Sequence, residues 1–586
     1  MHHHTITMTT LKQLLIACFL LGPASVLPLF AQVTPAVIAD EPLDNTPIDA
    51  AVWNGCTTPC AAWGSTDVRY PRNVLPSLPS ASGNLAGWRG EKVHAQAVVW
   101  SGTPLSSLTF SVEPFVMDSK SIPSNAITAG FVRYVRTDEY APGCGARPQS
   151  SQFDSSLVAD RIDTTTRSLP LPAGQVRCLW LSCRIPAGAA PGLYKGAVKV
   201  MGDGKLIARL PLTLRVVNRL LPPPSQWKFH LDLWQNPFAV ARLYQVPLWS
   251  EAHLEAMRPL MKILADAGQK VITASIMHHP WNAQTYDAFE SMVTWSRKLD
   301  GSWQFDFSVF DRWVQFMMEL GIDRQINCYS MVPWRASFLY FDCATNRMQE
   351  WKASPGEAAY DEVWGAMLSQ FEAHLKSKGW LDKTAIAMDE RPMEVMQKAL
   401  RLIHRSAPHL KVSLAGNYHA PIENDLYDYC IAVEQQFPDS VLAARQAAGK
   451  VSTFYTCCAQ LHPNTFTFSS PADAAWIGPY CASRGLDGYL RWSYNSWPKS
   501  PLVDSRFTAF PAGDTYIVYP GAGSSVRMEK MIEGIQTYEK IQILRQEKSP
   551  AQYKAVEREL GKFDMKNFDE GTAASHVQAV EKLLNR

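Results

Sequence analysis

Short runs that alternate apolar and polar residues fill the chain between about residues 35 and 220. The clearest are "KVHAQAVVW", "SLTFSVEPF", "QVRCLWLSCRI", "YKGAVKVM" and "KLIARLPLTLRVV", which Gly, Pro and Ser turns separate. A period of two places every second side chain on one face of a strand, and short strands at this spacing are typical of an antiparallel sandwich. Prolines at 222–224 then favour a stiff, extended connector. We therefore predict an antiparallel β-sandwich over residues 32–222.

Beyond the connector, strand-like runs alternate with helix-like runs. Eight apolar runs begin near residues 229, 270, 325, 384, 411, 427, 451 and 488. Most segments between them repeat apolar residues every three or four positions, as "SEAHLEAMRPLMKILADAG" does, which indicates amphipathic helices. Eight such units predict a (β/α)8 TIM barrel over residues 223–546, followed by a polar helical tail, 547–586, that packs on the barrel.

Two long insertions, 277–305 and 332–356, follow the second and third predicted strands and are rich in Trp, Tyr and Phe. In a barrel, loops that follow strands lie on the carboxyl face, where active sites are built. We therefore expect both insertions to border the functional site.

The N-terminus has a different pattern. Lys12 precedes "LLIACFLLGPASVLPLFAQ", an apolar stretch that contains two prolines and includes the small residue Ala31 near its end. This predicts a signal peptide over residues 1–31 and an exported protein, periplasmic or secreted. Lipid anchoring through Cys18 is an alternative, but the apolar stretch before Cys18 is unusually short for it. No later segment is long and apolar enough to cross a bilayer, so we expect no membrane span after signal removal.

Composition and charge narrow the function classes. The chain is 46% hydrophobic and 19% charged, which is a globular profile. It carries 56 Lys and Arg against 54 Asp and Glu, with no long basic block, so we expect no nucleic-acid partner. Some disulfides are expected in an exported protein, first between Cys56 and Cys60, whereas the neighbours Cys457 and Cys458 read as free, packed thiols.

The segment "TAIAMDERP" places two carboxylates, Asp389 and Glu390, directly after an apolar run. They fall at the end of the fourth barrel strand, where Pro392 fits the first turn of a helix and keeps Arg391 extended. Two neighbouring carboxylates resist simultaneous ionisation, which leaves one of them able to donate a proton near neutral pH. Glycosidic bond cleavage needs this division of roles. The structural alternative is a pair of ordinary loop acids.

Aromatic and polar residues recur near the ends of the other predicted strands. Flat aromatic rings match the faces of sugar rings, and strand-end positions aim them at one cavity. The candidate substrate-binding residues are Asp232, Trp234, His279, Trp334, Asn417, Tyr455, Trp492, Tyr494, Asn495 and Trp497. Trp281 is a further aromatic residue near a strand end, and Gln235 and His278 are further polar ones.

Metal and serine-nucleophile sites are not indicated by any motif. Adjacent histidines such as His278 and His279 point to opposite sides of an extended chain, and apart from the histidine run at residues 2–4, which we set aside, no HxH or HExxH spacing occurs. No GxSxG segment occurs either. We therefore expect a site that uses neither a metal nor a cofactor.

Four segments together resemble glycoside hydrolase family 123, exported bacterial N-acetyl-β-galactosaminidases: "MDERP", "GYLRWSYNSWP", "DTYIVYPG" and "SVRMEKMIEGIQTYEKIQIL". The resemblance covers about 223–545, and "APGLYKGAVKV" resembles the N-terminal sandwich of the family. It implies substrate-assisted catalysis, with Glu390 as the acid/base and Asp389 orienting the 2-acetamido group of the substrate. No protein nucleophile is then required.

The expected function is removal of terminal β-linked N-acetylgalactosamine, from a glycan partner that ends in an N-acetylhexosamine. Two alternatives stay open. One is a conventional two-carboxylate glycosidase that uses a residue such as Asp232 as nucleophile and a sugar without the acetamide. The other is a non-catalytic glycan-binding protein on the same barrel. Galacto and gluco substrates differ by one hydroxyl epimer, and sequence does not distinguish them.

Overall fold

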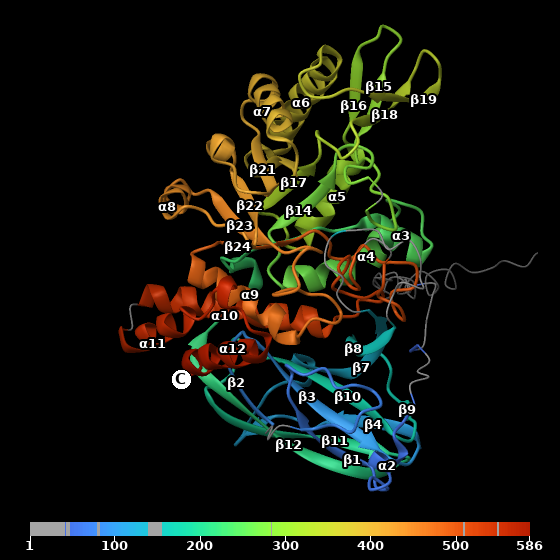
Figure 1. The fold of residues 1–586 in the computed structure, drawn as a ribbon, viewed down its shortest axis with the longest axis vertical. Coiled ribbons are helices and arrows are strands. Elements are labelled where there is room, and N and C mark those ends of the chain that lie inside the picture. Colours follow the sequence, from blue (N-terminus) through green and yellow to red (C-terminus); the bar gives the residue numbers. More distant parts are fainter. Residues whose placement is uncertain are drawn as a thin grey trace, which may run out of the picture.

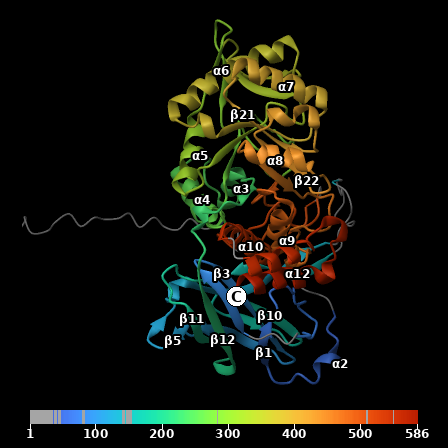
Figure 2. The ribbon, with the colours of Figure 1, turned by 90° about the vertical axis from the view of Figure 1, so that its left-hand side faces the viewer.

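A computed structural model describes residues 35, 41–42, 47–78, 83–138, 144, 155–282, 284–507, 510–547 and 550–586. The predicted signal peptide, with Cys18, lies outside the described residues. Along the long axis of the molecule a sheet-rich N-terminal region lies at one end and the barrel at the other, with the C-terminal helices between them (Figures 1 and 2). None of the described helices is long and apolar enough to span a membrane.

The N-terminal region consists of two sheets. The first has the order β1 (Cys60–Gly64), β3 (Lys92–Ser101), β10 (Gln175–Arg184), β7 (Ile127–Thr137) and β8 (Ser156–Asp163). The second has the order β2 (Asn84–Arg89), β12 (Lys205–Leu220), β11 (Gly192–Gly202), β4 (Leu105–Val112) and β9 (Leu169–Leu171), with β5 (Val116–Met117) and β6 (Lys120–Ser121) at its side. The pairs are antiparallel, as predicted, except that β2 runs parallel to β12.

Strand β10 is buried on both of its faces. Leu179 and Leu181 pack into the core between the two sheets. Cys178 and Trp180 point the other way and join a second cluster that includes Val526 of α10 (Val526–Glu547). The first sheet therefore lies between the second sheet and the C-terminal helices, and much of its far face is buried. Helix α2 (Ala50–Trp53) adds Trp53 to the same cluster.

The barrel has eight parallel strands, in the places where the eight apolar runs predict them. Their order around the sheet is β13 (His230–Leu233), β24 (Gly488–Arg491), β23 (Val451–Tyr455), β22 (Asp428–Ala432), β21 (Lys411–Gly416), β20 (Thr384–Met388), β17 (Gln325–Tyr329) and β14 (Val271–Ser275). The helices that follow these strands are α3 (Pro237–Tyr244), α4 (Glu251–Asp266), α5 (Ser308–Glu319), α6 (Ala358–Lys378), α7 (Met393–Ser406), α8 (Asp439–Ala447) and α9 (Pro471–Arg484).

The barrel is nearly closed, because β13 and β14 are joined without a regular ladder. A single bridge pairs Leu231 with Gln269. Buried side-chain amides supply further hydrogen bonds: Gln269 accepts from the Leu233 N–H at 3.0 Å, and Gln235 accepts from the Thr273 N–H at 2.9 Å. Gln235, which sequence suggested as a site residue, therefore contributes to the barrel seam.

The two aromatic-rich insertions form one small sheet. Its order is β16 (Trp303–Asp306), β15 (Thr294–Arg297), β18 (Ser337–Asp342) and β19 (Arg347–Lys352), so each insertion contributes a hairpin. The helical tail consists of α11 (Pro550–Leu560) and α12 (Glu570–Leu584). It packs on α9 and also reaches the sandwich, where the Trp88 indole donates to the Leu584 carbonyl at 3.1 Å. The prediction that the tail packs on the barrel is thus incomplete.

Short 3₁₀ turns complete the described secondary structure. They are η1 (Ser124–Ala126), η3 (Pro224–Gln226), η4 (Leu381–Lys383), η5 (Ala420–Asp425) and η6 (Met565–Asn567). The second of these falls in the predicted proline connector and brings Trp227 into the barrel core.

Candidate active site

Asp389 and Glu390 follow β20 without a gap. All five residues of β20 are buried, and its neighbours β17 and β21 run parallel to it. Pro392 caps the start of α7, so the two carboxylates lie on the short junction between strand and helix. Asp389 is only 8% exposed, whereas Glu390 is exposed. The two neighbours therefore have different environments.

Asp389 is held by two side chains. The Trp334 indole Nε1–H donates to its Oδ2 at 3.0 Å, and Arg391 Nη2 lies 3.0 Å from its Oδ1. Burial raises the pKa of Asp389 to about 6; Arg391 and Trp334 oppose this effect, and the charge of Glu390 adds to it. Asp389 is consequently ionised at neutral pH and takes up a proton in mild acid.

Arg391 is fixed in turn by the loop that follows β17. Its Nε–H donates to the Val332 carbonyl at 2.9 Å, and its Nη1–H donates to the Glu390 carbonyl at 2.6 Å. Its guanidinium lies 4.1 Å from the centre of the Trp334 ring, a cation–π contact. The sequence reading gave Arg391 only a backbone role, although its place beside the acid pair could have suggested an ion pair with one of them.

Glu390 is bound by Tyr455, the last residue of β23. The Tyr455 hydroxyl donates to Glu390 Oε1. Tyr455 is 8% exposed, so its ring is supported by the barrel while its hydroxyl reaches the acid. This bond joins the ends of two strands that are not neighbours in the sheet.

A cavity of about 180 Å³ opens beside the pair. Its described walls are Cys144, Trp234, Trp281, Gln284, Trp334, Asp389, Glu390, Ala415, Tyr455, Cys457, Cys458, Leu490, Trp492 and Phe510. Four of the predicted substrate-binding residues are among them: Trp234, Trp334, Tyr455 and Trp492. The cavity therefore combines two carboxylates with several aromatic faces, the surface that a sugar ring requires.

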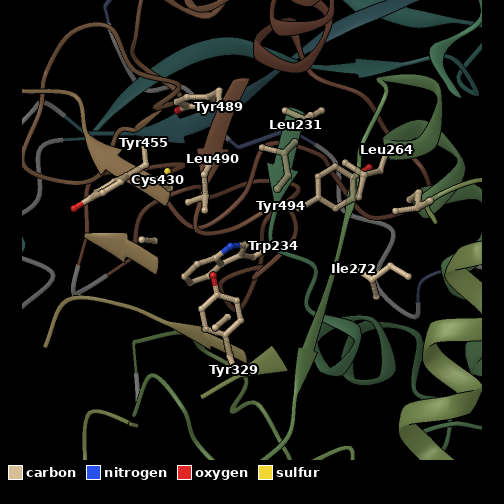
Figure 3. Close-up of a cluster of buried hydrophobic side chains, with 14 of the residues drawn as sticks. Leu231, Trp234, Leu264, Ile272, Tyr329, Cys430, Tyr455, Tyr489, Leu490 and Tyr494 are labelled. Atoms are coloured by element: carbon tan, nitrogen blue, oxygen red, sulfur yellow. The ribbon is translucent and has the colours of Figure 1, made fainter. Parts of the chain in front are cut away.

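The tryptophans on one side of the cavity stack on one another. Trp234 and Trp281 have ring centres 4.9 Å apart at an interplanar angle of 27°. Tyr329 backs Trp234 at 4.5 Å, and Figure 3 shows the two side by side below Leu490. Trp492 is anchored by its indole, which donates to Asp514 at 3.2 Å.

Three predicted residues after β24 do not reach this cavity. Tyr494 donates to the Leu260 carbonyl at 2.8 Å, and Trp497 donates to the Val518 carbonyl at 2.7 Å. Asn495 exchanges two hydrogen bonds, both of 2.8 Å, with the backbone of Asn236. All three are fully buried. Their polar atoms bind backbone groups, so their role is to hold the segment that follows the strand.

Asp232 lies in the barrel interior and is not part of the cavity wall. It is the third residue of β13 and is 2% exposed. Asn327 approaches it at 3.4 Å. Burial raises the pKa of Asp232 well above its usual range, and the nearby charge of Asp428 raises it further. Burial therefore favours the protonated form of Asp232, and the residue lies outside the cavity wall, badly placed to attack a substrate.

His278 and His279 come together, contrary to the expectation that they point apart. Their ring centres are 3.8 Å apart, and His278 Nδ1 lies 2.8 Å from Glu290. The expectation assumed extended chain, but His279 has φ 53°, a left-handed conformation. Ligand atoms of the three residues lie within 4.8 Å of one another, so this group could hold a metal ion. His279 is not among the described residues that line the cavity.

Asn417 lies on a second cavity. That cavity has a volume of about 390 Å³ and is lined by Glu390, Arg391, Pro392, Met393, Met396, Leu414, Gly416, Asn417 and His419. Glu390 thus borders both cavities.

The disulfide prediction was wrong. Cys458 is bonded to Cys144, 314 residues away in sequence, while Cys56 and Cys60 are free. Cys144 and Cys458 both line the smaller cavity, so a residue from the sandwich part of the chain reaches the barrel mouth. Sequence spacing carries no signal for a pair this far apart. Cys457, predicted as a free thiol, is free.

Comparison with known proteins now decides the family. The family model "Glycoside hydrolase 123, catalytic domain" matches residues 234–544, more than half of the chain. The chain belongs to glycoside hydrolase family 123. The N-terminal domain model of the same family matches residues 63–202. This family 123 protein is therefore a glycoside hydrolase, and a glycan is its substrate.

Solved structures agree with this assignment. A family 123 glycoside hydrolase from Clostridium perfringens, studied for glycolipid glycan hydrolysis, is 28% identical with a TM-score of 0.82, over 90% of this chain and 98% of that one. A family 5 xyloglucanase from Bacteroides ovatus is 9% identical over 78% of this chain and 99% of that one, with a TM-score of 0.27, too low to bear on function. No curated protein matches the chain significantly in sequence.

Proposed function

We propose that this enzyme removes terminal β-linked N-acetylgalactosamine from glycans by retaining, substrate-assisted catalysis. Glu390 acts as the acid/base, and Asp389 orients the 2-acetamido group. The predicted signal peptide supports action outside the cytoplasm. The glycolipid glycans on which the Clostridium perfringens relative was studied support a glycan substrate of that kind.

One observation carries the mechanism. Asp389 and Glu390 are the only carboxylates among the described residues that line either cavity at the barrel mouth. A conventional retaining glycosidase needs an acid/base and a separate carboxylate nucleophile, about 5 Å apart across the bond that breaks. Sequence neighbours on one junction, one of them already bound to Arg391 and Trp334, fit that arrangement poorly. When the acetamide of the substrate acts as the nucleophile, the protein needs no second carboxylate for that role.

The residues then perform the following steps. Glu390 gives its proton to the glycosidic oxygen while the bond from that oxygen to the anomeric carbon breaks. The acetamide carbonyl oxygen attacks the anomeric carbon from the opposite face, and Asp389, ionised, accepts a hydrogen bond from the acetamide N–H and stabilises the positive charge. Glu390, now a carboxylate, takes a proton from a water molecule whose oxygen attacks the anomeric carbon, and the bond from that carbon to the acetamide oxygen breaks. Two inversions give net retention.

The surroundings of Asp389 suit this role. An anion that stabilises a developing positive charge is most effective in a site of low dielectric, and Asp389 is buried. Arg391 and the Trp334 indole fix its direction before the substrate arrives. Preorganisation of this kind avoids reorganisation of the site during the reaction.

The alternative nucleophile, Asp232, is disfavoured by its position. Burial raises its pKa well above the usual range, which disfavours the carboxylate form that must attack, and it lies outside the described cavity wall. The non-catalytic alternative is disfavoured by membership of a hydrolase family together with an intact acid pair.

A panel of chromogenic β-glycosides tests the proposal. The N-acetylgalactosaminide should be hydrolysed, and the galactoside with a 2-hydroxyl should be turned over at least about 100-fold more slowly, since it lacks the nucleophile. NMR of the first-formed sugar should show the β-anomer. A thiazoline mimic of the cyclised intermediate should inhibit strongly, and less so in Asp389→Asn. An α-anomer, or equal turnover of the two glycosides, would overturn the mechanism.

A further inference from the structure

Three side chains that can bind a metal ion come together beside the barrel mouth. His278 and His279 follow β14, and Glu290 lies twelve residues after His278 in the first insertion. The ring centres of the two histidines are 3.8 Å apart, and His278 Nδ1 lies 2.8 Å from a carboxylate oxygen of Glu290. One ligand atom from each residue lies within 4.8 Å of the other two. Ligand atoms around a tetrahedral ion are about 3.4 Å apart, so side-chain movements of about 1 Å bring all three onto one ion.

The backbone turns both histidine rings to the same side. Neighbouring side chains of an extended chain point to opposite sides, but His279 has φ 53°, in the left-handed region that residues other than glycine rarely adopt. The His279 N–H donates to the Phe289 carbonyl at 2.9 Å, which places the chain just before Glu290 beside the histidines. Backbone strain of this kind persists where the surrounding structure determines it, and it concentrates at binding and catalytic sites.

The chemistry of the three ligands favours zinc. Imidazole nitrogen and carboxylate oxygen both bind Zn²⁺, whereas Ca²⁺ and Mg²⁺ prefer ligand sets made only of oxygen. Glu290 brings the negative charge that a cation needs. Within the part of the chain that the structure describes, the His279 ring makes no hydrogen bond, so its nitrogens are available to an ion. Three protein ligands leave the fourth tetrahedral position to water.

The residues between the ligands form part of the active site. Trp281 and Gln284 line the smaller cavity, and Trp281 stacks on Trp234. The Pro280 carbonyl accepts a hydrogen bond at 3.1 Å from the N–H of Trp334, the residue whose indole binds Asp389. An ion that joined the two ends of the loop 278–290 would therefore fix a wall of the cavity.

We propose that His278, His279 and Glu290 bind one Zn²⁺ ion, and that this ion holds the loop 278–290 in place at the cavity. The ion takes no part in the chemistry, because none of its ligands is among the described residues that line the cavity. The inference does not depend on which sugar the enzyme cleaves.

Zinc binding by the full-length enzyme tests the site. The chelator-treated protein is titrated with zinc chloride, and bound zinc is measured by mass spectrometry after the excess has been removed. Glu290→Gln keeps a hydrogen-bonding group but loses the charge, and His279→Asn keeps a residue that tolerates the left-handed backbone. Each variant should bind zinc at least about 100-fold more weakly than the wild type at this site. Because the histidines at residues 2–4 can also bind zinc, the difference between wild type and variant is the measure.

A second histidine–glutamate pair provides matched controls. His409 Nδ1 lies 2.9 Å from Glu372, and among the described residues no third ligand joins this pair. Glu372→Gln and His409→Asn should therefore bind as much zinc as the wild type. Equal zinc binding by the wild type and by the Glu290 and His279 variants would overturn the site.

The role of the ion has a separate readout. In the wild type, zinc should slow amide hydrogen exchange in the loop 278–290 at least about tenfold, whereas in Glu290→Gln it should not. Chelation should raise KM for an activated glycoside about threefold and leave kcat unchanged, because the ion positions the wall and does not react. Zinc that binds without slowing exchange in the loop would overturn the bracing role. A loss of kcat on chelation that added zinc restores would also overturn that role, since it would place the ion in the reaction.

Discussion

Two pairs of carboxylates in this barrel lie in contrasting environments. Asp389 and Glu390 stand at the barrel mouth, on a cavity wall, with Arg391 and Tyr455 as partners. Asp232 and Asp428 lie inside the barrel on β13 and β22, and both are nearly inaccessible. The interior pair is enclosed by a layer of polar side chains from other strands.

That polar layer supplies hydrogen bonds to Asp428 without exposing it. Gln325 donates to Asp428 at 2.7 Å, and Ser413 donates to the same oxygen at 3.2 Å. Burial lowers the pKa of His230, which lies 3.8 Å from Asp428, despite that negative neighbour. A barrel interior is usually filled by branched apolar residues, so these groups replace part of an apolar layer by a hydrogen-bonded one.

The difference between the pairs is one of position along the strand. Asp389 is the first residue after β20, whereas Asp232 is the third residue within β13. The aromatics show a looser relation: Trp234 and Trp492 come directly after their strands, Tyr455 is the last residue of β23, and all three line the cavity, while Tyr494 lies further on and turns into the core. A carboxylate near a barrel strand is a site residue only where the strand has ended.

The largest expected effect tests this comparison directly. Glu390→Gln should slow hydrolysis of natural glycans by roughly 10²–10⁴-fold, the range for a lost general acid/base. Asp232→Asn should change kcat/KM less than about threefold, because the side chain reaches no substrate. Steady-state kinetics on one oligosaccharide measure both.

A good leaving group provides the control, because it needs little protonation. The loss in Glu390→Gln should therefore be much smaller for the glycosylation step of an activated aryl glycoside. Comparable losses in Asp232→Asn and Glu390→Gln would break the comparison and restore the conventional two-carboxylate mechanism.

Most of the barrel was predictable because parallel strands buried on both faces read as continuous apolar runs. The joining of β13 to β14 by Gln235 and Gln269 was not, since buried amides look like surface residues in sequence. Nor was the small sheet of four strands, because its two hairpins come from insertions that β17 separates. The parallel pairing of β2 with β12 likewise depends on tertiary packing, and the alternation of apolar and polar residues does not predict it.

The sequence predicts the candidate site only as far as it predicts where a barrel strand ends. "MDERP" locates Asp389 and Glu390 because Pro392 marks the junction. The disulfide between Cys144 and Cys458 depends on how the sandwich meets the barrel, which no local pattern records. The fixed positions of Asn417 and His419 depend on Tyr429 of the next strand, which sequence does not reveal either.

The second prediction concerns the pH dependence of activity. Asp389 must be ionised to stabilise the acetamide, and burial raises its pKa to about 6. Activity limited by this group should therefore fall as the pH falls through 6, and at pH 5 about one tenth of it should remain. A profile of kcat/KM between pH 4.5 and 8 measures this limb. Asp232→Asn should keep the same fall in kcat/KM at low pH. If the fall disappears in that variant, the titrating group is Asp232 and not Asp389.

The smallest expected effect is on stability, and it distinguishes the two buried acids. A raised pKa means that the folded state holds a proton which the unfolded state releases above about pH 4. Stability then falls by about 1.4 kcal/mol per pH unit between the unfolded and the folded pKa. For Asp389 this loss should end once the pH passes about 6. For Asp232, whose pKa is raised well above the usual range, it should continue beyond that pH.

Replacement of each acid by Asn removes its titration and exposes this difference. The melting temperature of Asp389→Asn, relative to wild type, should rise between pH 4 and about 6 and then level off. The same difference for Asp232→Asn should keep rising above pH 6, because burial raises the pKa of Asp232 well above its usual range. Thermal unfolding at half-unit pH steps measures both curves. If the two curves level off at the same pH, the interior and mouth carboxylates have similar environments, and the contrast drawn between them fails.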